Sequence, residues 1–247
     1  MKAFIAAALV VLTSVSIASA DSFFHRLRVD SLVSDGVTLY HTGDYQGSIE
    51  KFDDALSLSS DDVEALFDRG LDQYALGQYQ AAADDFQASL KLQPDFVPAL
   101  FNLGVSDIAL NQLDAAKAIF QQIIDQHPSS VRAHFDMGLS TYLEGDTSTA
   151  AEQFTVAALL HPQYVQAHYD KALALYRTGN LVAADQEAGA ALKLSNSFAK
   201  AYFLRGAIRL RQGDDSDAKS QFEQAAKYTG DPVLKSLCGQ IIAQIGA

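Results

Sequence analysis

The segment from Val63 to Phe96 decides how the chain is organised, and it reads VEALFDRGLDQYALGQYQAAADDFQASLKLQPDF. Two amphipathic stretches of helical spacing flank Gly77, a residue that accepts the left-handed conformation at a helix end. Pro94 cannot continue a helix, so it ends the second stretch. The segment therefore predicts a helix, a tight turn and a second helix.

The pattern returns every 34 residues from Val29 to Pro232 without an insertion, and it gives six repeats. These are residues 29–62, 63–96, 97–130, 131–164, 165–198 and 199–232. Four series of equivalent residues share this register. They are Gly36, Gly70, Gly104, Gly138, Ala172 and Gly206; Gly43, Gly77, Asn111, Gly145, Gly179 and Gly213; Ser48, Ala82, Ala116, Ala150, Ala184 and Ala218; and Phe52, Phe86, Phe120, Phe154, Ala188 and Phe222.

Each series has a physical reason. A glycine inside a helix costs about 1 kcal/mol relative to alanine, so its recurrence in the first helix predicts that no side chain fits there. The alanine series supplies a matching small surface, and the phenylalanine series fills the space beside it. Ala188 breaks the phenylalanine series, which predicts loose packing and a hinge in the fifth repeat. The residue after the turn is a good N-cap in four repeats, as Asp44, Asp146, Asn180 and Asp214.

This pattern resembles the tetratricopeptide repeat family. The residues that carry the resemblance are Leu66, Gly70, Tyr74, Gly77, Tyr79, Ala82, Phe86, Leu90 and Pro94. It implies an all-α, right-handed superhelical solenoid of antiparallel helix pairs, with a concave face built mainly from first helices. In that family this face usually binds a peptide or a helix of another protein. Residues 233–247 follow the last repeat and read as a capping helix with Cys238 on its apolar stripe.

The N-terminus reads as an export signal. In residues 1–20, Lys2 precedes an apolar run, and Ala18-Ser19-Ala20 is a small-residue cleavage site, so the mature chain is expected to start at Asp21. Residues 21–28 then form a short N-terminal segment. A membrane-spanning helix is the alternative, although the run is short for one. We expect an exported protein, in the periplasm or cell envelope or secreted, with no membrane span in its mature chain.

The charge of the chain limits the kinds of partner that it is expected to bind. The 247 residues include 18 Lys and Arg, 30 Asp and Glu, and one Cys, and the formal charge is −12. Binding to nucleic acid without sequence preference needs a basic surface, so this charge argues against it. Protein or peptide partners are expected instead.

The resemblance implies that the fifth, ninth and twelfth places of each repeat face the concave side. The residues at these places that we select as a partner-binding groove are Phe67, Leu71, Tyr74, Phe101, Val105, Phe135, Leu139, Tyr142, Tyr169 and Tyr176. Aromatic anchors of this kind suit an apolar peptide or an amphipathic helix. That many of them pack between helices instead remains open. The family's carboxylate clamp needs Lys and Asn at the fifth and ninth places, where this chain has apolar residues, so a chaperone-tail adaptor is argued against.

Charge is unevenly spread along the repeats. Residues 29–130 carry 4 basic and 17 acidic residues, whereas residues 131–232 carry 10 and 12. We hypothesise that the first half attracts basic partner residues and that Arg177, Lys200 and Arg211 in the second half bind a carboxylate. Arg205 and Arg209 add to that basic half. Two differently solvated surfaces are the alternative.

Catalysis finds no support in the sequence, which has no phosphate-binding loop, nucleophile elbow or zinc motif. We therefore expect a protein that is not an enzyme and has no cofactor. His134 and His168 are equivalent residues, but a metal site would need a third ligand, with Asp136 or Asp170 the candidates, and repetition alone explains the spacing. The prediction is an exported interaction module or scaffold with no metal. The alternative is a self-assembling envelope protein, a homo-oligomer in which residues 21–28 (DSFFHRLR) enter a neighbour's groove.

Overall fold

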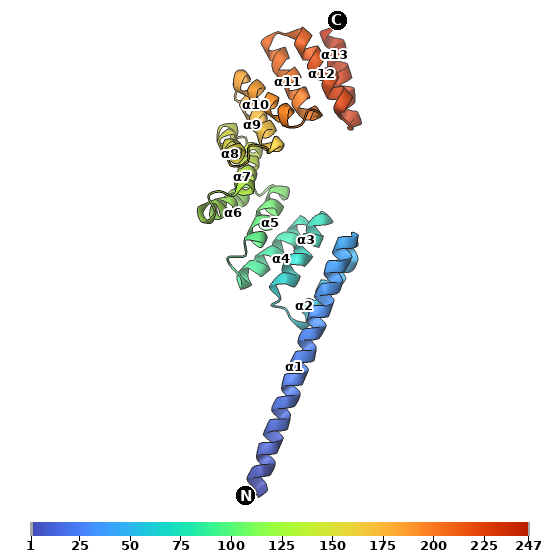
Figure 1. Cartoon of the computed structure of the whole chain (residues 1–247), viewed down its shortest axis with the longest axis vertical. Coiled ribbons are helices and arrows are strands. Elements are labelled where there is room, and N and C mark those ends of the chain that lie inside the picture. Colours follow the sequence, from blue (N-terminus) through green and yellow to red (C-terminus); the bar gives the residue numbers. More distant parts are fainter. Residues whose placement is uncertain (1, 247) are drawn as a thin grey trace. The chain divides into compact units, whose positions relative to one another are not determined.

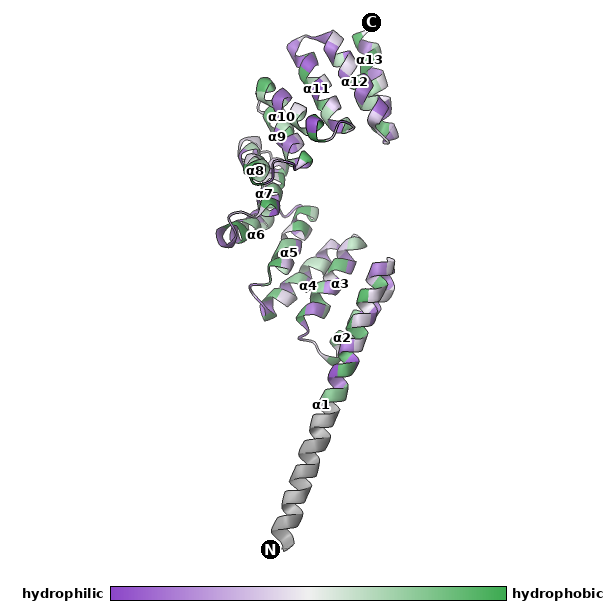
Figure 2. Cartoon of the chain, in the orientation of Figure 1, coloured by the Kyte–Doolittle hydropathy of each residue, from purple (hydrophilic) through white to green (hydrophobic). Residues whose placement is uncertain are grey.

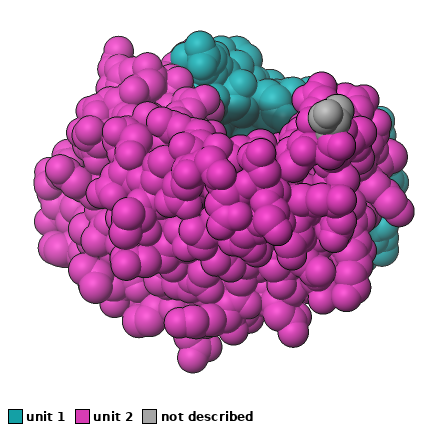
Figure 3. All heavy atoms as spheres, turned by 90° about the horizontal axis from the view of Figure 1, so that it is seen from above, with its two compact units in different colours: residues 1–111 teal, residues 112–247 magenta. Residues whose placement is uncertain are grey.

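The computed structural model describes the backbone of residues 2–246 and the side chains of residues 22–246. Over this range the regular structure consists of thirteen α-helices and no strand (Figure 1). The predicted all-α array of helix pairs is thereby confirmed. The helices divide into two compact units, residues 1–111 and residues 112–247 (Figure 3).

Unit 1 contains five helices, and each packs against the next. They are α1 (Lys2–Thr42), α2 (Tyr45–Leu58), α3 (Val63–Ala75), α4 (Tyr79–Leu92) and α5 (Val97–Ala109). The predicted export signal, residues 1–20, lies outside the residues whose side chains are described.

Unit 2 contains eight helices, again packed in chain order. They are α6 (Leu113–Gln126), α7 (Val131–Glu144), α8 (Thr147–Leu160), α9 (Val165–Arg177), α10 (Leu181–Leu194), α11 (Ala199–Gln212), α12 (Asp215–Tyr228) and α13 (Pro232–Ile245). Apolar and polar residues alternate along these helices (Figure 2), as expected of helices with one buried face. Among the described residues, no helix carries an apolar stretch long enough to cross a membrane.

The turns between paired helices form as the sequence predicts. Gly43, Gly77, Asn111, Gly145, Gly179 and Gly213 all have positive φ, from 59° to 102°. All four predicted N-caps are confirmed, since their side chains accept hydrogen bonds from backbone N–H groups in the first turn of the next helix. Gln78 and Gln112 make no such bond.

The glycine of the first helix lies against the phenylalanine of the second. A Cβ atom added to Gly138 would lie 2.8 Å from Cδ1 of Phe154, and one added to Gly70 would lie 2.7 Å from Cε1 of Phe86. Gly36 and Gly206 meet Phe52 and Phe222 in the same way. These contacts confirm that the ring excludes any side chain at the glycine.

The fifth repeat replaces both partners of this contact with alanine. Ala172 and Ala188 are fully buried in one cluster with Ala184, Leu204 and Ile208. The hinge expected in this repeat stays a prediction, and Ala188 is nonetheless enclosed in the core. The reason is that the small residue at 188 accompanies a larger one at 172 and that leucine and isoleucine side chains of α11 complete the core.

Helix α13 covers the apolar face of α12. Cys238 is fully buried against Ala218, Phe222 and Ala225, and burial raises the pKa of its thiol. Leu234, Ile241, Ile242 and Ile245 pack on the same cluster, whereas Leu237 of the same helix is 41% exposed.

Candidate functional site

Unit 2 contains a hollow of about 250 Å³ between its first helices. Its lining comes from α7, α8, α9 and α11. The lining residues are Leu139, Tyr142, Leu143, Phe154, Gln166, Tyr169, Asp170, Leu173 and Lys200. Four residues selected from the sequence, Leu139, Tyr142, Tyr169 and Lys200, therefore meet at one place, with apolar walls that suit an aliphatic or aromatic side chain.

One side of this hollow is polar. Burial raises the pKa of Asp170 to about 6, and the Gln166 amide and the Lys200 charge oppose the rise. Nε2 of Gln166 donates to Asp170 at 2.9 Å. Burial, with the charge of Asp170 next, raises the pKa of Tyr169 to about 12, so its hydroxyl stays protonated at neutral pH. The hollow thus offers a carboxyl, an ammonium and phenol hydroxyl groups beside apolar walls.

Two predicted arginines lie on tyrosines of the preceding repeat. The guanidinium carbon of Arg177 is 4.6 Å from the ring centre of Tyr142, and that of Arg211 is 4.9 Å from the ring centre of Tyr176. Nη1 of Arg211 also donates to the Tyr176 carbonyl at 3.0 Å. Both arginines are exposed, so an anion in solvent can reach them.

The aromatic residues at the fifth place pack mainly on aromatic residues of their own repeat. Phe67 has its ring centre 5.0 Å from that of Phe96, and Phe135 lies 5.0 Å from Tyr164 in the same way. The ring centre of Tyr169 is 5.1 Å from that of Phe198. The first two rings are therefore chiefly packing residues, as the alternative interpretation of the sequence allowed.

The other residues selected in unit 1 do not converge. Leu71 lines a separate hollow of about 130 Å³. Tyr74 lies 5.1 Å from Tyr79, ring centre to ring centre. Phe101 is buried and Val105 is half-buried, and neither lines a hollow described here.

Sequence reasoning did not place the sixth residue of the repeats in the site. Asp68, Asp136 and Asp170 occupy this place, and burial raises the pKa of each to about 6. Their spacing of 68 and 34 residues was a usable signal, because a carboxylate that recurs beside apolar ninth-place residues is costly to bury without a purpose.

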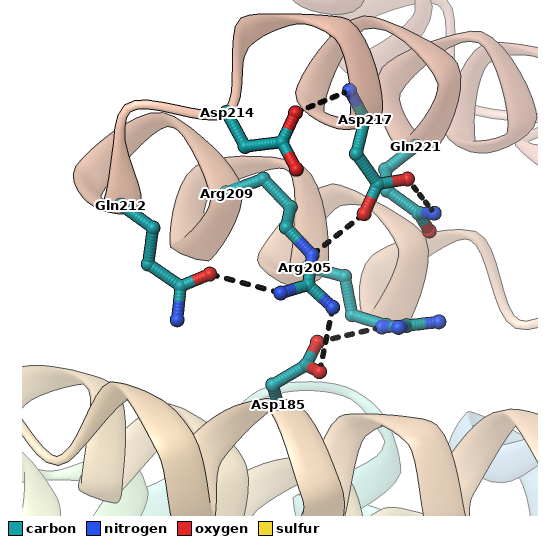
Figure 4. Close-up of polar contacts among 7 residues, drawn as sticks. All are labelled: Asp185, Arg205, Arg209, Gln212, Asp214, Asp217 and Gln221. Carbon is teal, nitrogen blue, oxygen red and sulfur yellow. Dashed lines mark hydrogen bonds and ion pairs between the residues drawn. The ribbon is translucent and has the colours of Figure 1, made fainter.

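Arg205 and Arg209 belong to the packing of unit 2 (Figure 4). Nε of Arg205 and Nη2 of Arg209 both donate to Asp185 at 2.8 Å, and Nε of Arg209 lies 2.6 Å from Asp217. These contacts join α10, α11 and α12. The two arginines therefore stabilise the helix stack, unlike the exposed Arg177 and Arg211 with which the sequence grouped them.

The equivalent histidines hold the loops between repeats. Nε2 of His134 lies 3.0 Å from the Pro128 carbonyl, and its Nδ1 lies 2.9 Å from Oε1 of Gln153. His168 repeats this arrangement with Pro162 and Glu187. Both nitrogens of each ring are thus engaged, and among the side chains described no group of three or more His, Cys, Asp or Glu is placed to hold a metal ion.

Comparison with known families agrees with this architecture. Models of the tetratricopeptide repeat match residues 73–135, 136–193 and 169–232. The chain belongs to the tetratricopeptide repeat family. No curated protein matches it.

Several solved structures share the fold. MamA from Desulfovibrio magneticus RS-1, residues 41 to the end, is 19% identical with a TM-score of 0.66, over 69% of this chain and 97% of that one. A tetratricopeptide repeat protein from Parabacteroides merdae ATCC 43184 is 22% identical with a TM-score of 0.66, over 90% and 85%. YrrB, described as having an unusual peptide-binding site, is 20% identical with a TM-score of 0.61, over 69% and 88%. At these identities the likeness shows the fold alone.

Proposed function

We propose that this chain is an exported interaction module that binds a segment of a partner protein along its first helices and catalyses no reaction. The hollow in unit 2 carries the proposal, because it combines apolar walls with a polar side formed by Asp170 and Lys200. Such a lining fixes both the side chain and the orientation of a bound segment. The family is typically one of protein-interaction modules, and YrrB, a structural relative, is described as having a peptide-binding site.

Peptide selection tests this function directly. A random peptide library is selected on residues 21–247, and the affinity of the best binder is then measured by calorimetry. Leu139→Ala, which alters the hollow, should weaken the selected peptide by about tenfold, the effect of losing roughly 1.4 kcal/mol of contact. Val182→Ala, at a 67% exposed residue of the second helix α10, should leave affinity unchanged. Equal affinities for both variants and the original chain would contradict the proposal.

The exposed arginines add polarity to the proposed site. Arg177 and Arg211 hold their guanidinium groups on the rings of Tyr142 and Tyr176, which leaves them oriented for a carboxylate of the partner. Replacing both with Ala should lower the affinity for an acidic selected peptide and reduce its dependence on salt. Unchanged affinity would count against this role.

Export is the second part of the proposal, and it rests on the sequence of residues 1–20. Expression of the full chain with its signal, followed by N-terminal sequencing of the exported fraction, should give a chain that starts at Asp21. A chain retained inside the cell with an intact N-terminus would contradict export.

Self-assembly is a second candidate function, and the N-terminal part of α1 favours it. Phe23 is 60% exposed, Phe24 is 66% exposed and Leu27 is 47% exposed. Three large apolar side chains that meet water on one short segment are suited to a neighbouring molecule. Light scattering of residues 21–247 should show an oligomer that residues 29–247 no longer form. A monomer in both cases removes this candidate.

A further inference from the structure

The hollow in unit 1 has the lining of a slot for a long cationic side chain. It lies between α1, α2 and α3 and is lined by Val37, Tyr40, His41, Phe52, Asp68 and Leu71. Valine, leucine and phenylalanine give apolar walls, Tyr40 gives an aromatic ring, and Asp68 gives the carboxylate. Lysine and arginine combine an apolar stem with a charged head. The apolar walls suit the stem, and the carboxylate suits the charged head.

The charge of Asp68 is not compensated within the described residues. Burial is the main cause that raises its pKa to about 6, and Glu64 and Asp62 raise it further, while only His41 lowers it. The next residue, Arg69, shows the opposite case, because Nε and Nη2 donate to both oxygens of Asp85 at 2.7 and 2.6 Å. Asp85 is thus paired with an arginine, whereas Asp68 has no ion pair among the described residues.

A second carboxylate, one turn further along α3, adds to the negative charge near Asp68. Asp72 is fully buried, and neither of its oxygens has a hydrogen-bond partner among the described residues. Residues 22–111 as a whole hold 15 Asp and Glu against 5 Lys and Arg. A cation placed at Asp68 would therefore be attracted by the whole unit as well as by the nearest carboxylate.

Unit 2 shows what occupies the equivalent place in other repeats. Tyr142 and Tyr176, at the twelfth place, each carry the arginine at the thirteenth place of the following repeat. Tyr40 is also at the twelfth place, but the following repeat supplies Ala75 instead of an arginine. Tyr40 is 37% exposed and lines the hollow together with Asp68, so a guanidinium from outside the chain could reach both.

We propose that this hollow binds an arginine side chain of the partner segment, with the guanidinium on Tyr40 and paired with Asp68. Arginine suits the site better than lysine because its planar group stacks on an aromatic ring and pairs with a carboxylate through two N–H groups. The inference rests on the proposed binding function and specifies that the partner carries an arginine that contacts unit 1.

The test uses N-acetyl-arginine-N-methylamide as the probe and methyl NMR of residues 21–247 as the readout. Titration should shift the methyl signals of Val37 and Leu71, and the matching citrulline amide, which has the same shape without the charge, should bind about tenfold more weakly or worse. Asp68→Asn should weaken the arginine probe by a similar factor. Asparagine stands at this place in the third repeat as Asn102, so the variant is expected to fold.

A second pair of variants separates site binding from general attraction to an acidic surface. Ala75→Arg supplies the missing guanidinium from within the chain and should block the probe, whereas Ala109→Arg, one repeat further on, should leave binding at Val37 and Leu71 intact. Equal binding of the arginine and citrulline probes, or shifts that avoid Val37 and Leu71, would overturn the inference. Selected peptides would still bind at Leu139 in that case, so the proposed function would stand.

Discussion

The fourth and fifth repeats build the same helix pair in two ways. In the fourth, Gly138 lets the ring of Phe154 lie against the backbone of α7. In the fifth, Ala172 and Ala188 meet instead, and Leu204 and Ile208 fill the remaining space. Both arrangements fill the space between the paired helices, so the residue at one place has to be considered together with its partner on the other helix.

Removing the large partner should have the largest effect. Phe154→Ala empties the space that repeat four fills with a ring, and it should lower the free energy of unfolding by about 3–5 kcal/mol. In the fifth repeat, Ala188→Gly removes only a methyl group and should cost about 1 kcal/mol. Denaturant unfolding of residues 21–247 measures both, and equal losses would break the comparison.

Replacing Gly138 with alanine should change the stability in a direction that depends on whether the ring of Phe154 is present. Gly138→Ala alone places a Cβ against Phe154 and should destabilise by about 1–3 kcal/mol. In the Phe154→Ala background the clash is gone, and the same change should stabilise by roughly 1 kcal/mol because alanine is the better helix former. A double-mutant cycle checks the reversal. Additive effects would show that these two residues do not limit each other.

The tenth place extends the comparison to a buried charge. Ser106 and Ser140 donate to the carbonyls of Asn102 and Asp136 at 2.8 Å, whereas Asp72 holds this place in repeat two with no partner. Asp72→Ser should therefore stabilise the protein at pH 7.5 by about 1–3 kcal/mol. The matched reverse change, Ser140→Asp, should destabilise it.

The pH dependence of this effect has a definite sign. Burial, with the negative charge of Asp68 adding to it, raises the pKa of Asp72 from 3.8 to about 6. Between these values the folded chain keeps a proton that the unfolded chain loses, so stability is full below the lower value and falls as pH rises through the upper one. The Asp72→Ser variant should show a shallower fall than the original chain. Identical slopes would mean that Asp72 does not titrate in this range.

The smallest effects concern helix caps. Asp146 accepts a hydrogen bond from the Thr149 N–H at 3.1 Å, whereas Gln78 caps nothing. Asp146→Ala should cost about 1 kcal/mol, and Gln78→Asp should gain a similar or smaller amount. Thermal unfolding of the two variants measures both. A loss in each would show that the turns differ in more than the cap residue.

The sequence was sufficient where one residue type recurs at a place with a local role. The turn residues, the N-caps and the fit of glycine beside phenylalanine all followed from the 34-residue register. The sequence pattern was insufficient where the packing depends on a pair of residues from two different series. Ala188 alone predicts a gap beside the helix, whereas the structure places Ala172 in the same buried cluster.

The candidate site was predictable to a similar extent. The ninth-place and twelfth-place residues Leu139 and Tyr142 do line the hollow in unit 2, since their register fixes the helix face, and their role in binding stays a prediction. The roles of Arg205 and Arg209 were not found, because Asp185 lies 20 and 24 residues away and meets them only once α10 and α11 pack. The repeat register predicts which face of a helix a residue lies on. Packing between helices then decides which charged side chains on that face remain unpaired and able to bind a partner.

A methyl NMR titration of residues 21–247 with a library-selected peptide tests the central claim, that the first helices hold a partner segment. We predict shifts at Leu139 and Leu173 in unit 2 that saturate with the peptide, and none at Leu194, an exposed residue at the end of the second helix α10. Shifts confined to second helices, with Leu139 and Leu173 unaffected at saturation, would contradict the account.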